Sequence, residues 1–129
     1  MAGNNYLLDT VIVAAFFNRE AVIRQRLPET TVYVSSITIG ELYYGAYHSQ
    51  HVTNNIRQIE NFIAINTIIP CDEITSQHYG RVKNMLRAKG RPIPENDIWI
   101  AATALQHGLT VVTRDAHFRE VDDLPIEVW

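Results

Sequence analysis

Short apolar segments with β-branched residues alternate along this chain with longer segments whose apolar residues recur at helical spacing. Strands are expected at residues 6–8, 31–34, 67–69, 109–112 and 126–129. Strands that alternate with helices pair in parallel and are covered by helices on both faces, which leaves few possible folds. The sequence therefore predicts an α/β protein with a mostly parallel sheet.

Capping and helix-breaking residues set the limits of the helices between these strands. Helices are expected at residues 11–18, 21–27, 54–65, 73–89 and 97–107. A further helix begins near Ser35 or Ser36, whose hydroxyl can cap it. Gly90 and Gly108 are expected to end the last two helices, and Pro94 is expected in the first turn of the last one.

The composition limits the class of protein. The 129 residues suit one domain that spans residues 1–129, and the 47% of apolar residues excludes a disordered chain. Because Cys71 is the only cysteine, an intrachain disulfide and a thiolate-rich metal site within one chain are excluded. No apolar run could span a bilayer, and the first ten residues lack the pattern of a secretory signal. A cytoplasmic protein without a membrane partner is expected.

Four acidic residues hold similar places relative to these elements. Asp9 directly follows the first strand, and Asp115 comes soon after the fourth. Glu41 lies one to two turns into the helix after the second strand, and Asp97 lies in the first turn of the helix before the fourth. Sites in open parallel sheets form at the carboxyl ends of strands. We therefore expect these four acids to converge on one edge of the sheet.

Four carboxylates in one cleft would require a cation. Two unit charges about 4 Å apart repel by about 4 kcal/mol at an effective dielectric constant near 20. Mg²⁺ or Mn²⁺ relieves this repulsion, because hard cations prefer oxygen ligands. Such ions also activate water and hold phosphate oxygens, so the pattern indicates hydrolysis of phosphodiester bonds. Taken singly, an acid after a strand often only caps a turn, and an acid in the first turn of a helix complements its dipole.

The segments that carry the acids resemble the ordered acidic motifs of the PIN domain, a family of metal-dependent nucleases. These segments are LLDT, SSITIGEL, PENDIWIAATAL and LTVVTRDAHF, and together they span nearly the whole chain. A single domain of this length is most similar to the VapC-type ribonuclease toxins of bacterial toxin–antitoxin pairs. The resemblance implies a three-layer α/β/α sandwich, an RNA substrate, a cognate antitoxin and a homodimer.

The resemblance also assigns roles to residues. It implies that Asp9, Glu41, Asp97 and Asp115 hold the metal and that Thr113 positions water. Many family members carry Asn or Ser two residues after the first Asp, where this chain has Val11. Two alternatives follow: Thr10 does that capping job instead, or the first helix starts differently. The nearby acids Glu95, Glu120, Asp122 and Asp123 compete with Asp97 or Asp115 for a place in the site.

Basic residues are unevenly distributed in this acidic chain, whose formal net charge is −3. Residues 81–91 hold five basic residues and no acid: Arg81, Lys83, Arg87, Lys89 and Arg91. One interpretation is a surface that guides RNA, because basic side chains bind phosphates. The other is a solvated helix face whose last turn favours cations. Arg114 is interpreted either as a phosphate contact or as the partner of a nearby acid.

The histidines, the tyrosines and the order of the acids each allow a second interpretation. The five histidines lack the spacing of a zinc site, so they are expected to be solvated or packed. Tyr43, Tyr44 and Tyr47 are expected to pack between helices; the alternative is a partner surface or a platform for an unpaired base. The apolar residues from Val11 to Ala15 are expected in the core. A signalling receiver domain would need paired acids after the first strand, which Asp9 does not have. A PIN fold that binds RNA or protein without cutting remains an alternative.

Overall fold

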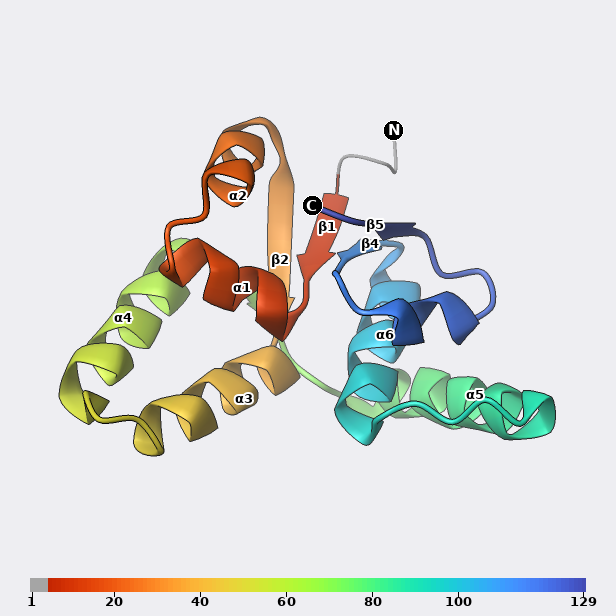
Figure 1. Cartoon of the computed structure of the whole chain (residues 1–129). Helices are drawn as coiled ribbons and strands as arrows, with labels where there is room; N and C mark the ends of the chain where they lie inside the picture. Colours follow the sequence, from red (N-terminus) through yellow and green to blue (C-terminus); the bar gives the residue numbers. More distant parts are fainter. Residues whose placement is uncertain (1–4) are drawn as a thin grey trace.

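The computed structural model describes residues 5–129, which form a five-stranded sheet between two layers of helices (Figure 1). The strands are β1 (Asn5–Leu8), β2 (Thr31–Ser35), β3 (Thr67–Ile69), β4 (Thr110–Val112) and β5 (Ile126–Glu127). Their order across the sheet is β3-β2-β1-β4-β5, and every neighbouring pair is parallel. The three-layer α/β/α architecture with a parallel sheet is therefore confirmed.

Helices fill the connections between these strands. They are α1 (Thr10–Phe17), α2 (Ala21–Arg26), α3 (Ser36–Tyr47), α4 (Val52–Ile65), α5 (Glu73–Lys89) and α6 (Glu95–His107), with short 3-10 helices η2 (Leu27–Glu29) and η3 (Ala116–Glu120). The predicted glycine ends are confirmed, since Gly90 and Gly108 follow α5 and α6 with φ of +67° and +66°. None of the helices within residues 5–129 is both long and apolar enough to cross a bilayer.

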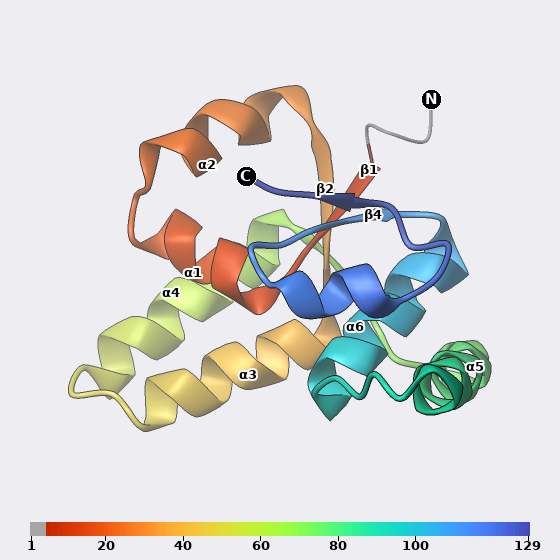
Figure 2. The same ribbon diagram turned by 45° about the vertical axis from the view of Figure 1, so that its right-hand side comes forward.

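The alternation of side chains along β1 divides the core between the two faces of the sheet. Leu7 packs on one face in a cluster that includes residues of α5, α6 and η3. Tyr6 and Leu8 pack on the other face in a cluster that includes residues of α1, α2, α3 and α4. The rotated view separates α5 and α6 from the helices of the first half of the chain (Figure 2). Each face of the sheet is thus buried under helices from a different half of the sequence.

Several boundaries differ from those predicted. Helix α6 begins at Glu95, because Pro94 has extended backbone angles and is the residue before the first turn, not a member of it. Strand β5 ends at Glu127 because β4 offers it only the register pairs at Val111 and Val112. Val11 is 51% exposed, so the prediction that it belongs to the core was wrong.

The order of the strands reverses at β1. One neighbour of β1 is β2, which leads outward to β3, and the other is β4, which leads to β5. In open parallel sheets the point of reversal leaves a crevice beyond the carboxyl ends of the two central strands. Leu8 pairs with Val112 across this point, so the residues that follow β1 and β4 enter the crevice together.

Candidate metal centre

The four predicted site acids, together with Glu95 at its edge, line one hollow of about 440 Å³ beyond the carboxyl ends of β1 and β4. Asp9 is the N-terminal cap of α1, and Asp115 is the N-terminal cap of η3. Glu41 lies in the middle of α3, and Asp97 lies in the first turn of α6. The structure therefore brings together the four acids that the sequence predicts would converge.

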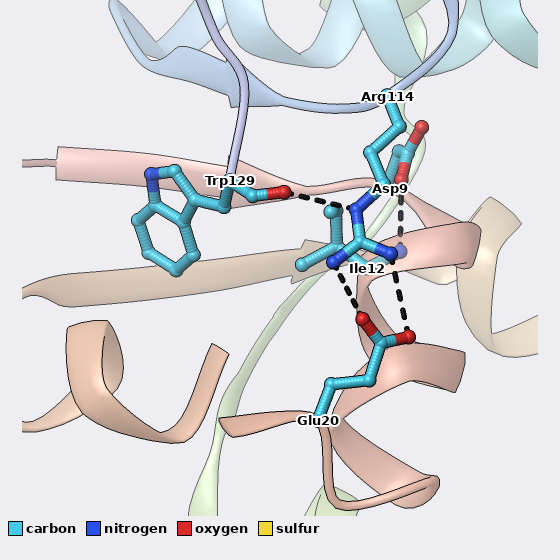
Figure 3. Close-up of polar contacts among 5 residues, drawn as sticks. All are labelled: Asp9, Ile12, Glu20, Arg114 and Trp129. Atoms are coloured by element: carbon cyan, nitrogen blue, oxygen red, sulfur yellow. Dashed lines mark hydrogen bonds and ion pairs between the residues drawn. The ribbon is translucent and has the colours of Figure 1, made fainter. Parts of the chain in front are cut away.

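Asp9 is the most rigidly held of the four acids and is only 4% exposed. Its carboxylate accepts hydrogen bonds from the backbone N–H of Ile12, at 3.1 Å, and from the hydroxyl of Thr113 (Figure 3 shows the first). Its backbone N–H donates to the carbonyl of Val112 across the β1–β4 junction, at 3.1 Å. Burial raises the pKa of the Asp9 carboxyl despite these hydrogen bonds. Asp9 therefore caps α1 itself, and of the two alternatives for the start of this helix, capping by Thr10 was wrong.

Thr10 instead orients Glu41. The Thr10 hydroxyl donates to Oε1 of Glu41, which lies 31 residues further along the chain. Thr10 also lies near the hydroxyl of Thr38, at 3.3 Å, in the first turns of α3. This contact directs the Glu41 carboxylate toward the residues that follow β1, and away from the apolar side of its own helix.

Asp97 and Asp115, which line the hollow, form a close group with His117, which does not line it. One ligand atom from each of the three lies within 4.8 Å of the other two. Nδ1 of His117 is 2.9 Å from Oδ1 of Asp115 and 3.5 Å from Oδ2 of Asp97. His117 was not predicted to lie here. The only signal for it was its place two residues after Asp115, because an acid that caps a turn draws the next two residues back over its own side chain.

The charges in the hollow are poorly compensated. Burial raises the pKa of Asp97 most, and the neighbouring carboxylates of Asp115 and Glu41 add to this effect, so that the pKa lies at about 6. The imidazole of His117 acts in the opposite direction but does not cancel the effect. Among residues 5–129, no Lys or Arg side chain forms an ion pair with any of the four acids. A cation is the simplest source of the missing positive charge.

The donors present fit a hard divalent cation. Carboxylate oxygens are the ligands that Mg²⁺ and Mn²⁺ prefer, and Asp9 and Asp115 have their other contacts already fixed by backbone N–H groups. A nitrogen from His117 is compatible with Mn²⁺ more than with Mg²⁺. The set contains no thiolate, which would have favoured zinc or an iron–sulfur cluster.

Three of the four competing acids have cationic partners, and the fourth lies outside the hollow. Glu95 lines the edge of the hollow, but its carboxylate contacts Nζ of Lys83 and the hydroxyl of Tyr79. Asp122 is 2.9 Å from Nζ of Lys89. Glu120 also has a basic neighbour, Arg91, and Asp123 lines a separate hollow beside Arg81. The geometry thus favours Asp97 and Asp115 as the site acids.

Acids from other parts of the chain also offset part of the positive charge of the basic segment at 81–91. Lys83, Lys89 and Arg91 each contact an acid from elsewhere in the sequence. Arg114 pairs with Glu20, which matches one of the two interpretations of Arg114. Guidance of RNA by Arg81, Lys83, Arg87, Lys89, Arg91 and Arg114 stays a prediction. The segment is less positive in the fold than in the sequence.

Two of the three tyrosines on α3 are exposed. Tyr44 and Tyr47 are 68% and 67% exposed, so the prediction that they pack between helices was wrong for both. Tyr43 is partly buried and stacks with Tyr47, with ring centroids 6.4 Å apart. Tyr44 lines a second hollow together with Thr10 and Glu41. Because Thr10 and Glu41 also line the acidic hollow, the second hollow places an aromatic ring beside it.

Comparisons with known proteins agree with this geometry. A family model described as the PIN domain matches residues 6–124. Ribonuclease VapC1 of Haemophilus influenzae (strain R2866) is 37% identical over 131 residues, which cover 96% of this chain and 97% of that protein. The tRNA(fMet)-specific endonuclease VapC of Shigella flexneri is 33% identical, with the same coverage. The fold is similar to a chain in the crystal structure of DNA-bound VapBC from Salmonella typhimurium, with a TM-score of 0.91, 32% identity and 97% and 98% of the two chains covered.

Proposed function

Because the chain belongs to the PIN-domain family, we propose that it is a metal-dependent endoribonuclease and the toxin of a toxin–antitoxin pair. The observation that carries this proposal is the single hollow in which Asp9, Glu41, Asp97 and Asp115 meet without a Lys or Arg partner among residues 5–129. The relatives named ribonuclease VapC1 and tRNA(fMet)-specific endonuclease VapC support the substrate class. The substrate we propose is RNA.

The four acids would hold one or two Mg²⁺ or Mn²⁺ ions. When bound, such an ion lowers the pKa of water and stabilises the charge that develops on a phosphate. Asp9 and Asp115 enter the hollow from the two central strands, and Glu41 and Asp97 enter it from α3 and α6. Without a cation these carboxylates would repel the phosphates of RNA, so the same residues prevent binding of the substrate by the metal-free protein.

Thr113 contributes through its neighbours. It is buried, its hydroxyl donates to Asp9, and its oxygen accepts the backbone N–H of Asp115 at 2.9 Å. We expect Thr113 to fix the orientation of both carboxylates. Thr113 would position water through the Asp9 oxygen that it binds.

The partners follow from the same family. The structural neighbour from Salmonella typhimurium is described as VapBC bound to DNA, and we propose that this chain likewise has a cognate antitoxin. We also propose that residues 1–129 act as one nuclease domain in the cytoplasm and that the chain forms a homodimer. The alternative, a PIN fold that binds RNA or protein without cleavage, would not need the charge of all four acids.

Cleavage of RNA by the purified chain tests the proposal. Total bacterial RNA is incubated in Mn²⁺ with the wild type, with Asp97→Asn, and with Asp122→Asn as a matched acid-to-amide control outside the hollow. We expect discrete fragments from the wild type and from Asp122→Asn, and none from Asp97→Asn or after addition of EDTA. A folded wild type that neither cleaves RNA nor binds Mn²⁺ would favour the alternative without cleavage.

A further inference from the structure

Arg114 connects three separate segments of the chain beside the candidate metal centre. Its Nε donates to the backbone carbonyl of Trp129 at 2.9 Å. Its Nη2 and Nη1 donate to the two carboxylate oxygens of Glu20 at 2.9 and 3.3 Å. Figure 3 shows the guanidinium between these two acceptors, with Asp9 close by. The planar guanidinium of Arg114 thus makes a bidentate contact with Glu20 and a third hydrogen bond with Trp129.

Both acceptors belong to firmly held parts of the fold. Glu20 precedes α2, where its backbone N–H donates to Ala15 at 3.1 Å and its carbonyl accepts from Arg24 at 3.2 Å. Trp129 is buried, and its ring packs edge-on against Tyr6 of β1 with centroids 5.3 Å apart. The guanidinium is therefore fixed to the α1–α2 turn and to the chain after β5.

The segment that Arg114 holds carries two residues of the site. Thr113 precedes it and donates its hydroxyl to Asp9, and Asp115 follows it and lines the hollow. This segment is a short loop between β4 and η3. Its backbone is bound to the sheet at Thr113, whose N–H donates to the carbonyl of Glu127 at 3.1 Å, whereas the N–H of Asp115 donates only within the segment, to the hydroxyl of Thr113 at 2.9 Å. A carboxylate on such a loop needs additional contacts to stay within the narrow range of positions that a metal ion accepts.

We propose that Arg114, fixed by Glu20 and the Trp129 carbonyl, is a positioning residue that sets the Thr113–Asp115 segment for metal binding. The inference rests on the proposed function, since it assumes that the acids hold a divalent cation. Arg114 does not line the hollow and is not a ligand. Its effect passes through Asp115 directly and through Thr113 to Asp9.

The geometry predicts an effect on metal affinity much larger than any effect on folding. The Arg114 and Glu20 side chains are 32% and 42% exposed, and ion pairs of this kind add little to the stability of the fold. The planar guanidinium makes three directed contacts at once, which a lysine ammonium cannot reproduce. If Arg114 acted only through its positive charge, lysine would replace it.

The chain offers a matched control. Arg26 also pairs with a glutamate, Glu127, at 2.8 Å, and it contacts the same C-terminal segment through the ring of Trp129. This pair connects α2 to β5, and neither of its two side chains contacts Thr113, Arg114 or Asp115. The backbone carbonyl of Glu127 accepts the N–H of Thr113 at 3.1 Å, but a side-chain substitution at Arg26 leaves that backbone bond in place. Arg26→Lys therefore alters an Arg–Glu contact of similar exposure without removing a contact of the Thr113–Asp115 segment.

The test is the Mn²⁺ dissociation constant, measured by calorimetry or by the EPR signal of free Mn²⁺. We expect Arg114→Lys and Glu20→Gln each to weaken Mn²⁺ binding about 10-fold, the scale typical of residues that support metal ligands. The double variant should be no weaker than Arg114→Lys alone, because the two side chains act as one unit. Arg26→Lys should bind Mn²⁺ as the wild type does, and cleavage by Arg114→Lys should recover at high Mn²⁺.

Wild-type affinity in Arg114→Lys would overturn the inference, as would independent, additive losses in Arg114→Lys and Glu20→Gln. If Arg114→Lys fails to fold, Glu20→Gln alone decides, since it keeps the arginine and removes only its bidentate partner. A wild type that binds no Mn²⁺ would overturn the metal centre itself, and this inference with it. That result is visible before any variant is compared.

Discussion

Two regions of this molecule differ in whether their acidic residues have a basic partner. At the edge formed by α5, the start of α6 and the loop after η3, Glu95 and Asp122 each contact a lysine. At the carboxyl ends of β1 and β4, Asp9 and Asp97 line a hollow together with Glu41 and Asp115, and the pKa values of Asp9 and Asp97 are raised. Acids of the first kind hold surface segments together. Acids of the second kind are held in a charged group that the protein alone does not neutralise.

The contrast shows what distinguishes a candidate ligand from a structural acid. Hydrogen bonds with Lys83 and Tyr79 lower the pKa of Glu95, whereas burial and like charges raise that of Asp97 only two residues away. Both lie in the first turn of α6, so position in the helix does not separate them. The two residues differ in the charged groups that the tertiary fold places beside each of them.

The largest difference between the two regions should appear in catalysis. Asp97→Asn should lower RNA cleavage at least about 100-fold, since removal even of groups that support metal ligands has effects of that order. Asp122→Asn should change cleavage less than about twofold, because its partner Lys89 lies away from the hollow. Initial rates at saturating Mn²⁺ measure both. Equal losses in the two variants would remove the distinction between the regions.

The second difference concerns pH. The folded Asp97 carboxyl has a pKa of about 6, above its ordinary value near 3.8, so between about pH 4 and 6 the folded state keeps a proton that the unfolded state has lost. The free energy of unfolding of the metal-free protein should therefore fall as pH rises through this window, by up to about 3 kcal/mol.

Denaturant unfolding in EDTA at several pH values measures this decline. Asp97→Asn should show a much flatter dependence and should be more stable than the wild type at pH 7, because it removes the buried charge. Asp122→Asn is the control. An identical decline in the wild type and in Asp97→Asn would contradict a crowded acidic hollow.

The third difference is the response to metal. A ligand at 100 times its dissociation constant stabilises the folded state by about 2.7 kcal/mol, which corresponds to roughly 10 °C in Tm for a chain of this size. We expect Mn²⁺ to raise the Tm of the wild type and of Asp122→Asn by this amount and to leave Asp97→Asn nearly unchanged. A similar rise in all three would place the bound ion outside the hollow.

The smallest effect should come from the paired edge itself. Asp122→Asn should lower the free energy of unfolding by less than about 1 kcal/mol, because partly exposed ion pairs contribute little. Chemical denaturation in low and high salt measures it, and salt should reduce the difference between variant and wild type. A loss of several kcal/mol would show that this edge is more than a surface contact.

The sequence predicted the parts of the fold that depend on local rules. Gly90 and Gly108 end their helices because few other residues adopt a positive φ readily. The four acids could be placed at one edge because parallel strands share a carboxyl end, which is a property of the topology. Neither prediction needed any knowledge of how side chains pack.

The features that the sequence did not reveal, or for which its prediction was wrong, depend on tertiary contacts. Lys83 and Lys89 belong to a segment without acids, and their partners come from α6 and from the loop after η3. The continuous apolar run from Val11 to Ala15 placed Val11 in the core, but the first turn of α1 borders the hollow, and Val11 lines it. The place of His117 depended on the turn that Asp115 caps.

Binding of Mn²⁺ to the metal-free protein tests the central claim most directly, because it concerns the four acids and not the identity of the RNA. Titration of the wild type, Asp97→Asn and Asp122→Asn at pH 7 gives the affinity and the number of ions bound. The account predicts binding by the wild type and by Asp122→Asn, and its loss in a folded Asp97→Asn. Equal binding by all three chains would contradict it.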